Sequence, residues 1–118
     1  MSTVLAVVAT LAAGGLGAVL RAVAVARSPR AGTTVANLVG TLFLALAIVA
    51  HDAGTIGGPL ALVLGVGLSG SLTTFSGWVA LLADGLAERP WRTVVVDLLV
   101  PLLVAVGLTV LAFAVLAP

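Results

Sequence analysis

The sequence predicts an all-α membrane protein with four transmembrane helices in a single domain, residues 1–118. Of the 118 residues, 62% are hydrophobic and only 8% are charged, whereas a soluble domain is about 45–50% apolar and about 25% charged. A chain of this length could not hide so much apolar surface from water. The apolar residues form runs at 3–26, 33–50, 57–83 and 93–116. Each reaches the roughly 20 residues that cross a bilayer, the second only just.

The first two runs are bounded by short polar segments. Residues 3–26 follow no basic segment and are too long for the apolar core of a signal peptide, so we expect a real span there. Residues 27–31, with two arginines and a proline, end this helix, and residues 51–54 end the run at 33–50. Such short connections make neighbouring helices antiparallel.

The third run, 57–83, is long enough to contain a break, and residues 84–90 close it. The fourth run, 93–116, contains Pro101, which is expected to kink the helix. Asp97 lies about one turn into this run. Asp97 is therefore either an acid favoured by the helix dipole or a group that handles a proton or an ion.

The polar stretch Gly70–Ser76 interrupts the third run with small and hydroxylated residues. Polar or irregular backbone at membrane depth survives only where protein buries it or where it lines a wet path. Carbonyls freed at a helix break can coordinate a hard cation such as Na⁺. The hydroxyls of Thr73, Thr74 and Ser76 can replace water around a small ion, and Phe75 can turn the positive edge of its ring toward an anion. This stretch is the primary candidate site.

Two further polar residues lie inside predicted spans. Asn37 needs a partner or a wet cavity, so it either makes an interhelical hydrogen bond or lines a pore. Arg21 either extends its charge to the membrane surface or holds a fixed charge at the vestibule of a pore.

Several function classes are disfavoured by composition. The single histidine and the four acidic residues are scattered at the membrane edges and form no catalytic group, which argues against an enzyme. The five basic residues are all arginines and form no basic stripe, which argues against nucleic-acid binding. The chain contains no cysteine, so it has no disulfide and no thiolate metal site.

The arginines predict an orientation in the membrane. When the four spans alternate, Arg21, Arg27, Arg30, Arg89 and Arg92 all fall on one side, and the other side has no arginine or lysine. Under the positive-inside rule the two arginine-bearing loops are cytoplasmic, and both termini lie outside a cell membrane that the chain crosses several times.

Three segments together resemble the Fluc (CrcB) family of fluoride channels. Residues 14–21 resemble its GGxxGAxxR motif, residues 32–40 its GTxxxNxxG motif, and residues 67–76 its GxxGGxTTFSTF core. The match covers nearly the whole chain in order, and the combination at these spacings on four spans is specific.

The resemblance implies an antiparallel dimer of four-helix subunits with two narrow pores for passive export of fluoride. It implies a structural Na⁺ at the dimer centre, held by the backbone carbonyls of Gly70 and Thr73 from both subunits. The pore asparagine would be Asn37 and the pore phenylalanine Phe75.

The remaining pore residues also follow from the resemblance. Ser76 and Thr74 would lie on the polar track, and Arg21 would be the vestibule arginine. Gly77-Trp78 stands where the family has Thr-Phe, so the second pore aromatic would be Trp78. Three other departures are Ser71 for a glycine, and Asp97 and Pro101 in the fourth span, where the family often has a tyrosine and serines.

The charge bias suggests a heterodimer. A homodimer that inserts in both orientations needs a nearly neutral bias, but this chain has five arginines on one side and none on the other. The family includes paired chains of fixed, opposite orientation, and we expect this chain to be one such partner, with a homodimer as the alternative. One of the two pores of such a dimer could then lose its conducting residues without loss of function of the dimer.

Two other functions compete with the channel. A small multidrug-resistance-type exporter would need a carboxylate in the first span, and residues 3–26 contain none. A non-transporting assembly subunit would use its glycine-rich faces only for packing.

Overall fold

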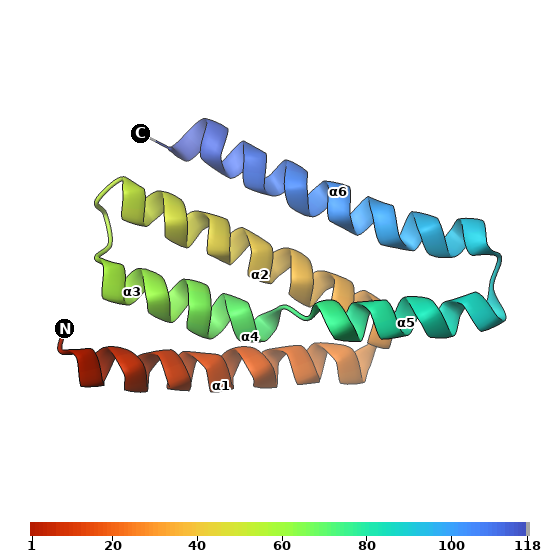
Figure 1. Cartoon of the computed structure of the whole chain (residues 1–118), viewed down its shortest axis with the longest axis horizontal. Helices are drawn as coiled ribbons and strands as arrows, with labels where there is room; N and C mark the ends of the chain where they lie inside the picture. The colour runs from red at the N-terminus through yellow and green to blue at the C-terminus, as the bar shows by residue number, and fades with distance from the viewer. Residues whose placement is uncertain (118) are drawn as a thin grey trace.

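The computed structural model, which describes residues 1–117, contains four helices long and apolar enough to cross a membrane. The third is divided into several elements by irregularities in its backbone (Figure 1). This confirms the predicted all-α fold with a broken third helix. The elements are α1 (Thr3–Arg27), α2 (Pro29–Asp52), α3 (Gly58–Leu62), the π-helical segment η1 (Val63–Ser69), α4 (Gly70–Leu72), α5 (Phe75–Glu88) and α6 (Trp91–Leu116).

The long helices lie side by side in a flat layer of 51 × 31 × 18 Å. Segment η1 packs against α1 and α2, and α6 packs against α2. Only 6% of the most apolar window of α1, and 6% of that of α6, is buried within the subunit. The apolar surfaces of these two helices therefore face outward, as lipid or a second subunit requires.

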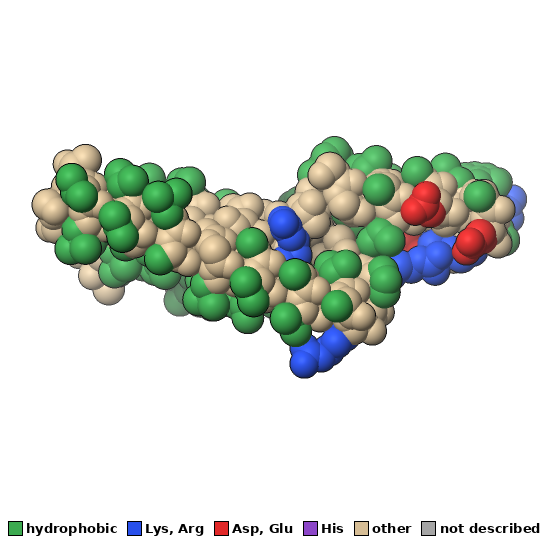
Figure 2. All heavy atoms as spheres, turned by 90° about the horizontal axis from the view of Figure 1, so that it is seen from below, with side chains coloured by type: hydrophobic (Ala, Val, Ile, Leu, Met, Phe, Trp, Pro, Cys, Tyr) green, Lys and Arg blue, Asp and Glu red, His purple; other side chains and the backbone are tan. Residues whose placement is uncertain are grey.

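The start of α1, the end of α6 and the α2–α3 connection lie at one end of this layer, and the two arginine-bearing connections lie toward the other (Figure 1). This arrangement is that of a protein that crosses the membrane several times. Charged side chains gather where α5 meets α6 (Figure 2).

The second and third spans extend furthest beyond their apolar runs. Helix α2 begins at Pro29 rather than at residue 33, because proline is well suited to a first helical turn, where its missing N–H costs no hydrogen bond. Helix α5 continues through residues 84–88, which leaves only Arg89 and Pro90 before α6. Helix α6 passes through Pro101 as a single helix.

Glycine lets α1 approach the third span closely. A Cβ at Gly17 would lie 2.5 Å from the Leu68 carbonyl oxygen, and one at Gly67 would lie 2.7 Å from the Thr10 carbonyl oxygen. At Gly15, by contrast, a Cβ would meet nothing within 4 Å. Close packing of the helices thus depends on particular glycines.

The third helix breaks at Thr73 and Thr74, within the predicted stretch. Thr73 has φ −82° and ψ 152°, and Thr74 has φ −151° and ψ 116°. Both residues are extended, so the backbone groups at the end of α4 and the start of α5 lose their helical partners.

Candidate functional site

The two threonine hydroxyls at the break form hydrogen bonds with the backbone around them. The Thr73 hydroxyl donates to the Ser69 carbonyl oxygen at 3.0 Å, and the Thr74 hydroxyl accepts from the Gly77 N–H at 3.2 Å. Thr73 therefore helps to end α4, and Thr74 is the N-cap of α5. Because the Thr74 oxygen acts as an acceptor in the cap, its own hydrogen stays available for donation.

Asn37 holds the break from α2. Its Oδ1 accepts from the Thr74 N–H at 2.7 Å, and its Nδ2 donates to the Thr74 carbonyl oxygen at 3.1 Å. One side chain thus satisfies both backbone groups of an extended residue at mid-span. Of the two possible roles for Asn37, the interhelical hydrogen bond is present. An amide carries two Nδ2 hydrogens, and a described residue accepts only one of them.

Arg21 reaches the same break from α1. Its Nη1 donates to the Thr73 carbonyl oxygen at 3.1 Å, across 52 positions of sequence. The guanidinium is therefore directed at the break. It places a fixed positive charge beside the end of α4, where unpaired carbonyls give a partial negative charge.

The carbonyls at the break are also the oxygens that a hard cation would use. Among the described residues no cluster of histidine and acidic side chains could hold a metal ion, so carbonyl and hydroxyl oxygens are the available ligands. Gly70 is exposed, and its carbonyl accepts only a long 3.4 Å bond from the Thr73 hydroxyl. The Thr73 carbonyl oxygen already accepts a hydrogen bond from Arg21, so a cation would share this oxygen with the guanidinium. One subunit offers few such oxygens, so a cation here would need the matching carbonyls of a second subunit.

A cavity of about 220 Å³ opens beside the break, between α2, α5 and α6. Asn37 contributes its amide, and Phe75 and Trp78 contribute aromatic rings. The two ring centroids are 6.3 Å apart at an interplanar angle of 70°, an edge-to-face pair. The hydroxyl-bearing residues of the lining are Thr34, Thr41, Thr73 and Thr74.

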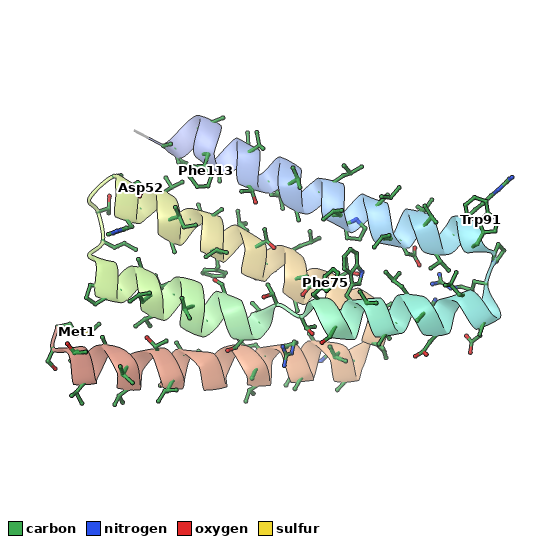
Figure 3. The ribbon with its side chains drawn as sticks, in the orientation of Figure 1. Met1, Asp52, Phe75, Trp91 and Phe113 are labelled. Carbon is green, nitrogen blue, oxygen red and sulfur yellow. The ribbon has the colours of Figure 1, made fainter. Side chains whose placement is uncertain are left out.

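Phe75 stands where α5 begins (Figure 3) and is 74% exposed within the subunit. Its neighbour Ser76 is also exposed, but it does not line the cavity. Arg21 binds the break without lining the cavity. Of the residues expected in a pore, the structure therefore brings together Asn37, Thr74, Phe75 and Trp78, and it places Ser76 on another face of α5.

A larger cavity of about 560 Å³ adjoins the smaller one, because the two share Thr34, Trp78 and Pro101 in their linings. Charged residues line this larger cavity, and Arg89 donates through Nη1 to Asp97 Oδ2 at 2.7 Å. This ion pair was not among the contacts expected from the sequence. Opposite charges on either side of a short helix–helix connection were the signal that could have identified it.

The chain is similar to one family of known proteins. Residues 8–115 match the family model described as "CrcB-like protein, Camphor Resistance (CrcB)". No curated protein matches the chain. The family match spans four apolar helices and includes the broken third helix with the cavity beside it. The chain therefore belongs to the CrcB-like family, which is the Fluc/CrcB family of fluoride channels.

Proposed function

We propose that this chain is a subunit of a fluoride-specific channel that passively exports fluoride across the cell membrane and so lowers its cytoplasmic concentration. The observation that carries this proposal is the cavity at the break, where the Asn37 amide, threonine hydroxyls and two aromatic rings meet at mid-span. Its lining places an amide and threonine residues, which can donate hydrogen bonds, beside two aromatic residues whose ring edges can attract an anion.

The chemistry of the lining suits fluoride. Fluoride is small and strongly hydrated, so a pore must replace its water with N–H and O–H donors. Among the described residues that line the smaller cavity, none is charged. An ion bound by neutral donors can leave again, and conduction needs binding that is tight enough to enter and weak enough to leave.

The exposed break supports an antiparallel dimer. Gly70, Phe75 and Ser76 are exposed at mid-span, where the freed backbone groups of the break cannot face lipid. A second subunit would cover them. In this assembly the carbonyls of Gly70 and Thr73 from both subunits would hold a structural Na⁺. Such an ion would neutralise converging carbonyl dipoles and hold the two breaks together.

The arginine bias favours a partner of opposite orientation, with both termini of this chain outside the cell. The absence of native cysteine allows a clean test with Ser2→Cys and Ala117→Cys. We expect a membrane-impermeant maleimide to label both variants on intact cells to completion. Labelling of only half of the molecules would show insertion in both orientations and contradict the heterodimer.

Fluoride efflux from liposomes tests the function itself. Purified protein, alone and together with an oppositely oriented homologue, is reconstituted in fluoride-loaded vesicles, and a fluoride electrode follows release. We expect fluoride to leave while a matched chloride load is retained. If neither preparation releases fluoride, the channel proposal is wrong.

Arg21→Gln is expected to slow fluoride efflux about tenfold. The substitution removes a charge-assisted hydrogen bond to the Thr73 carbonyl, and a bond of this kind contributes about 1.5–3 kcal/mol. The break then loses one of its two long-range supports. Arg27→Gln is the matched control, because Arg27 is exposed at the end of the same helix. Equal efflux from the two variants would contradict a role for Arg21 at the break.

A further inference from the structure

The π-helical segment η1 (Val63–Ser69) lies just before the break, and its residues line neither of the two cavities. Its hydrogen-bonded rings contain one residue more than those of an α-helix, and such turns are rare and frequent at functional sites. Each residue of an α-helix turns the chain by about 100°. A return of η1 to the α-helical form would rotate the residues after it by about one such step. The winding of η1 therefore sets the direction in which the break points.

Helices α1 and α2 hold η1 from two sides. A Cβ at Gly67 would lie 2.7 Å from the Thr10 carbonyl oxygen of α1, and one at Gly65 would lie 3.2 Å from Leu44 Cδ1 of α2. Rotation of the whole segment would bring side chains into these close contacts. A change in the winding of η1 would therefore be passed on to the break instead of being absorbed by movement of the segment.

Ser69 ends η1 and is 1% exposed. Its hydroxyl donates to the Leu64 carbonyl oxygen at 2.8 Å, five positions back. Three threonine hydroxyls also donate to carbonyl oxygens near the start of their own turn, but each reaches only four positions back: those of Thr10, Thr33 and Thr109. The bond from Ser69 thus has the spacing of a π-helix, and the bonds from the three threonines have that of an α-helix.

The backbone of Ser69 is joined to the break. Its carbonyl oxygen accepts from the Thr73 N–H at 3.1 Å and from the Thr73 hydroxyl at 3.0 Å. The Thr73 carbonyl oxygen in turn accepts from Arg21 at 3.1 Å. Ser69 therefore connects the last π-helical turn, through its side chain, with the first residue of the break, through its carbonyl.

We propose that Ser69 is a positioning residue for the fluoride path, because its hydroxyl holds the π-helical winding of η1. That winding directs the backbone groups of Thr73 and Thr74 toward their partners on α1 and α2. This inference rests on the proposed function, in which the break lies beside the fluoride path. Ser69 itself is buried away from both cavities and acts only through the break.

The sequence allows the direction of the break to be measured by NMR. It contains two Thr-Thr pairs, Thr33-Thr34 in α2 and Thr73-Thr74 at the break. Threonine labelled with carbon-13 at the carbonyl and nitrogen-15 at the amide therefore gives one carbonyl–amide correlation for each pair. The correlation of the break reports the Thr73 carbonyl and the Thr74 N–H, which are the groups bonded to α1 and α2.

We expect Ser69→Ala to shift the correlation of the break in detergent-solubilised protein and to leave that of α2 unchanged. Ser71→Ala is the matched control, because it removes the same hydroxyl from a half-buried residue outside η1 and closer to the break in sequence. Ser69→Cys keeps a weak donor of similar size, so we expect a smaller shift, and it replaces Ser69→Ala if that variant fails to fold. An unmoved correlation of the break in either Ser69 variant, or an equal shift in Ser71→Ala, would overturn the proposal.

Efflux from liposomes separates positioning from a general loss of stability. We expect Ser69→Ala to slow efflux by about fivefold, the factor that one neutral hydrogen bond contributes to an equilibrium. If Ser69 acts by directing the Thr73 carbonyl to Arg21, the double variant with Arg21→Gln should conduct at nearly the rate of Arg21→Gln alone. Two losses that multiply would show that Ser69 acts elsewhere and would overturn the proposal. If the parent protein releases no fluoride, the channel proposal fails, and the NMR measurement still judges Ser69 because it needs no flux.

Discussion

Asn37→Ala is expected to lower fluoride efflux at least tenfold and to reduce thermal stability. The substitution strands the N–H and the carbonyl of Thr74, which Asn37 binds at 2.7 and 3.1 Å. Each unsatisfied buried group costs about 1–3 kcal/mol, and about 1.4 kcal/mol corresponds to a factor of ten in an equilibrium. The break should then sample other conformations, and the cavity beside it should lose its shape.

The combination of two measurements separates the roles of Asn37. Efflux is measured in liposomes, and stability is measured by the survival of a monodisperse peak after heating in detergent. Substitution of a residue that only donates to a passing ion would lower efflux and leave stability unchanged. The two hydrogen bonds from Asn37 to the Thr74 backbone predict that the substitution lowers both. Thr109→Ala is the control, because the Thr109 hydroxyl bonds only to Ala105 of its own helix, at 2.9 Å. If Asn37→Ala and Phe75→Ala both leave efflux unchanged, neither residue serves the fluoride path.

Gly17→Ala is expected to destabilise the protein by about 1–3 kcal/mol, the usual cost of overpacking. The new Cβ would lie 2.5 Å from the Leu68 carbonyl oxygen and 3.1 Å from the Leu72 nitrogen. These are backbone atoms, which cannot rotate away, so α1 must separate from the third span. Arg21 lies one turn further along α1, and the separation would also lengthen its bond to the Thr73 carbonyl.

Gly15→Ala provides a control two residues away on the same helix. A Cβ at Gly15 meets nothing within 4 Å, and alanine favours helix formation over glycine. We therefore expect a neutral or slightly stabilising effect, measured by the same heating assay. Equal loss of stability in the two variants would show that contact with the Leu68 carbonyl is not the cause of the destabilisation.

The location of the break could be predicted from the sequence, but its hydrogen bonds could not. Small and hydroxylated residues at 70–76 stand out against their apolar surroundings. The partners of the break come from other helices, however: Asn37 lies 37 positions from Thr74, and Arg21 lies 52 positions from Thr73. For Asn37 and Arg21 the sequence left two roles open, because spacing along one helix does not determine which helix lies opposite.

The Arg89–Asp97 ion pair and the place of Ser76 outside the cavity also depend on which helix lies opposite, which spacing along one helix does not determine. From the sequence, Asp97 is an acid in the first turns of a helix. In the structure, the short α5–α6 connection places Arg89 beside it, and the two side chains form an ion pair at 2.7 Å. Ser76 shares the polar stretch with Thr74 but lies on another face of α5, outside the cavity.

The sequence by itself determined the membrane class, the helices that can cross a bilayer and the place where the third one breaks. These properties depend on local hydropathy and on run length against a fixed bilayer thickness, and both can be read along a single segment. Only the tertiary structure decided which atoms satisfy the break, which residues share a cavity and which charges pair. Those outcomes depend on contacts between helices distant in sequence, and the packing of α1, α2 and α6 around the third span sets them.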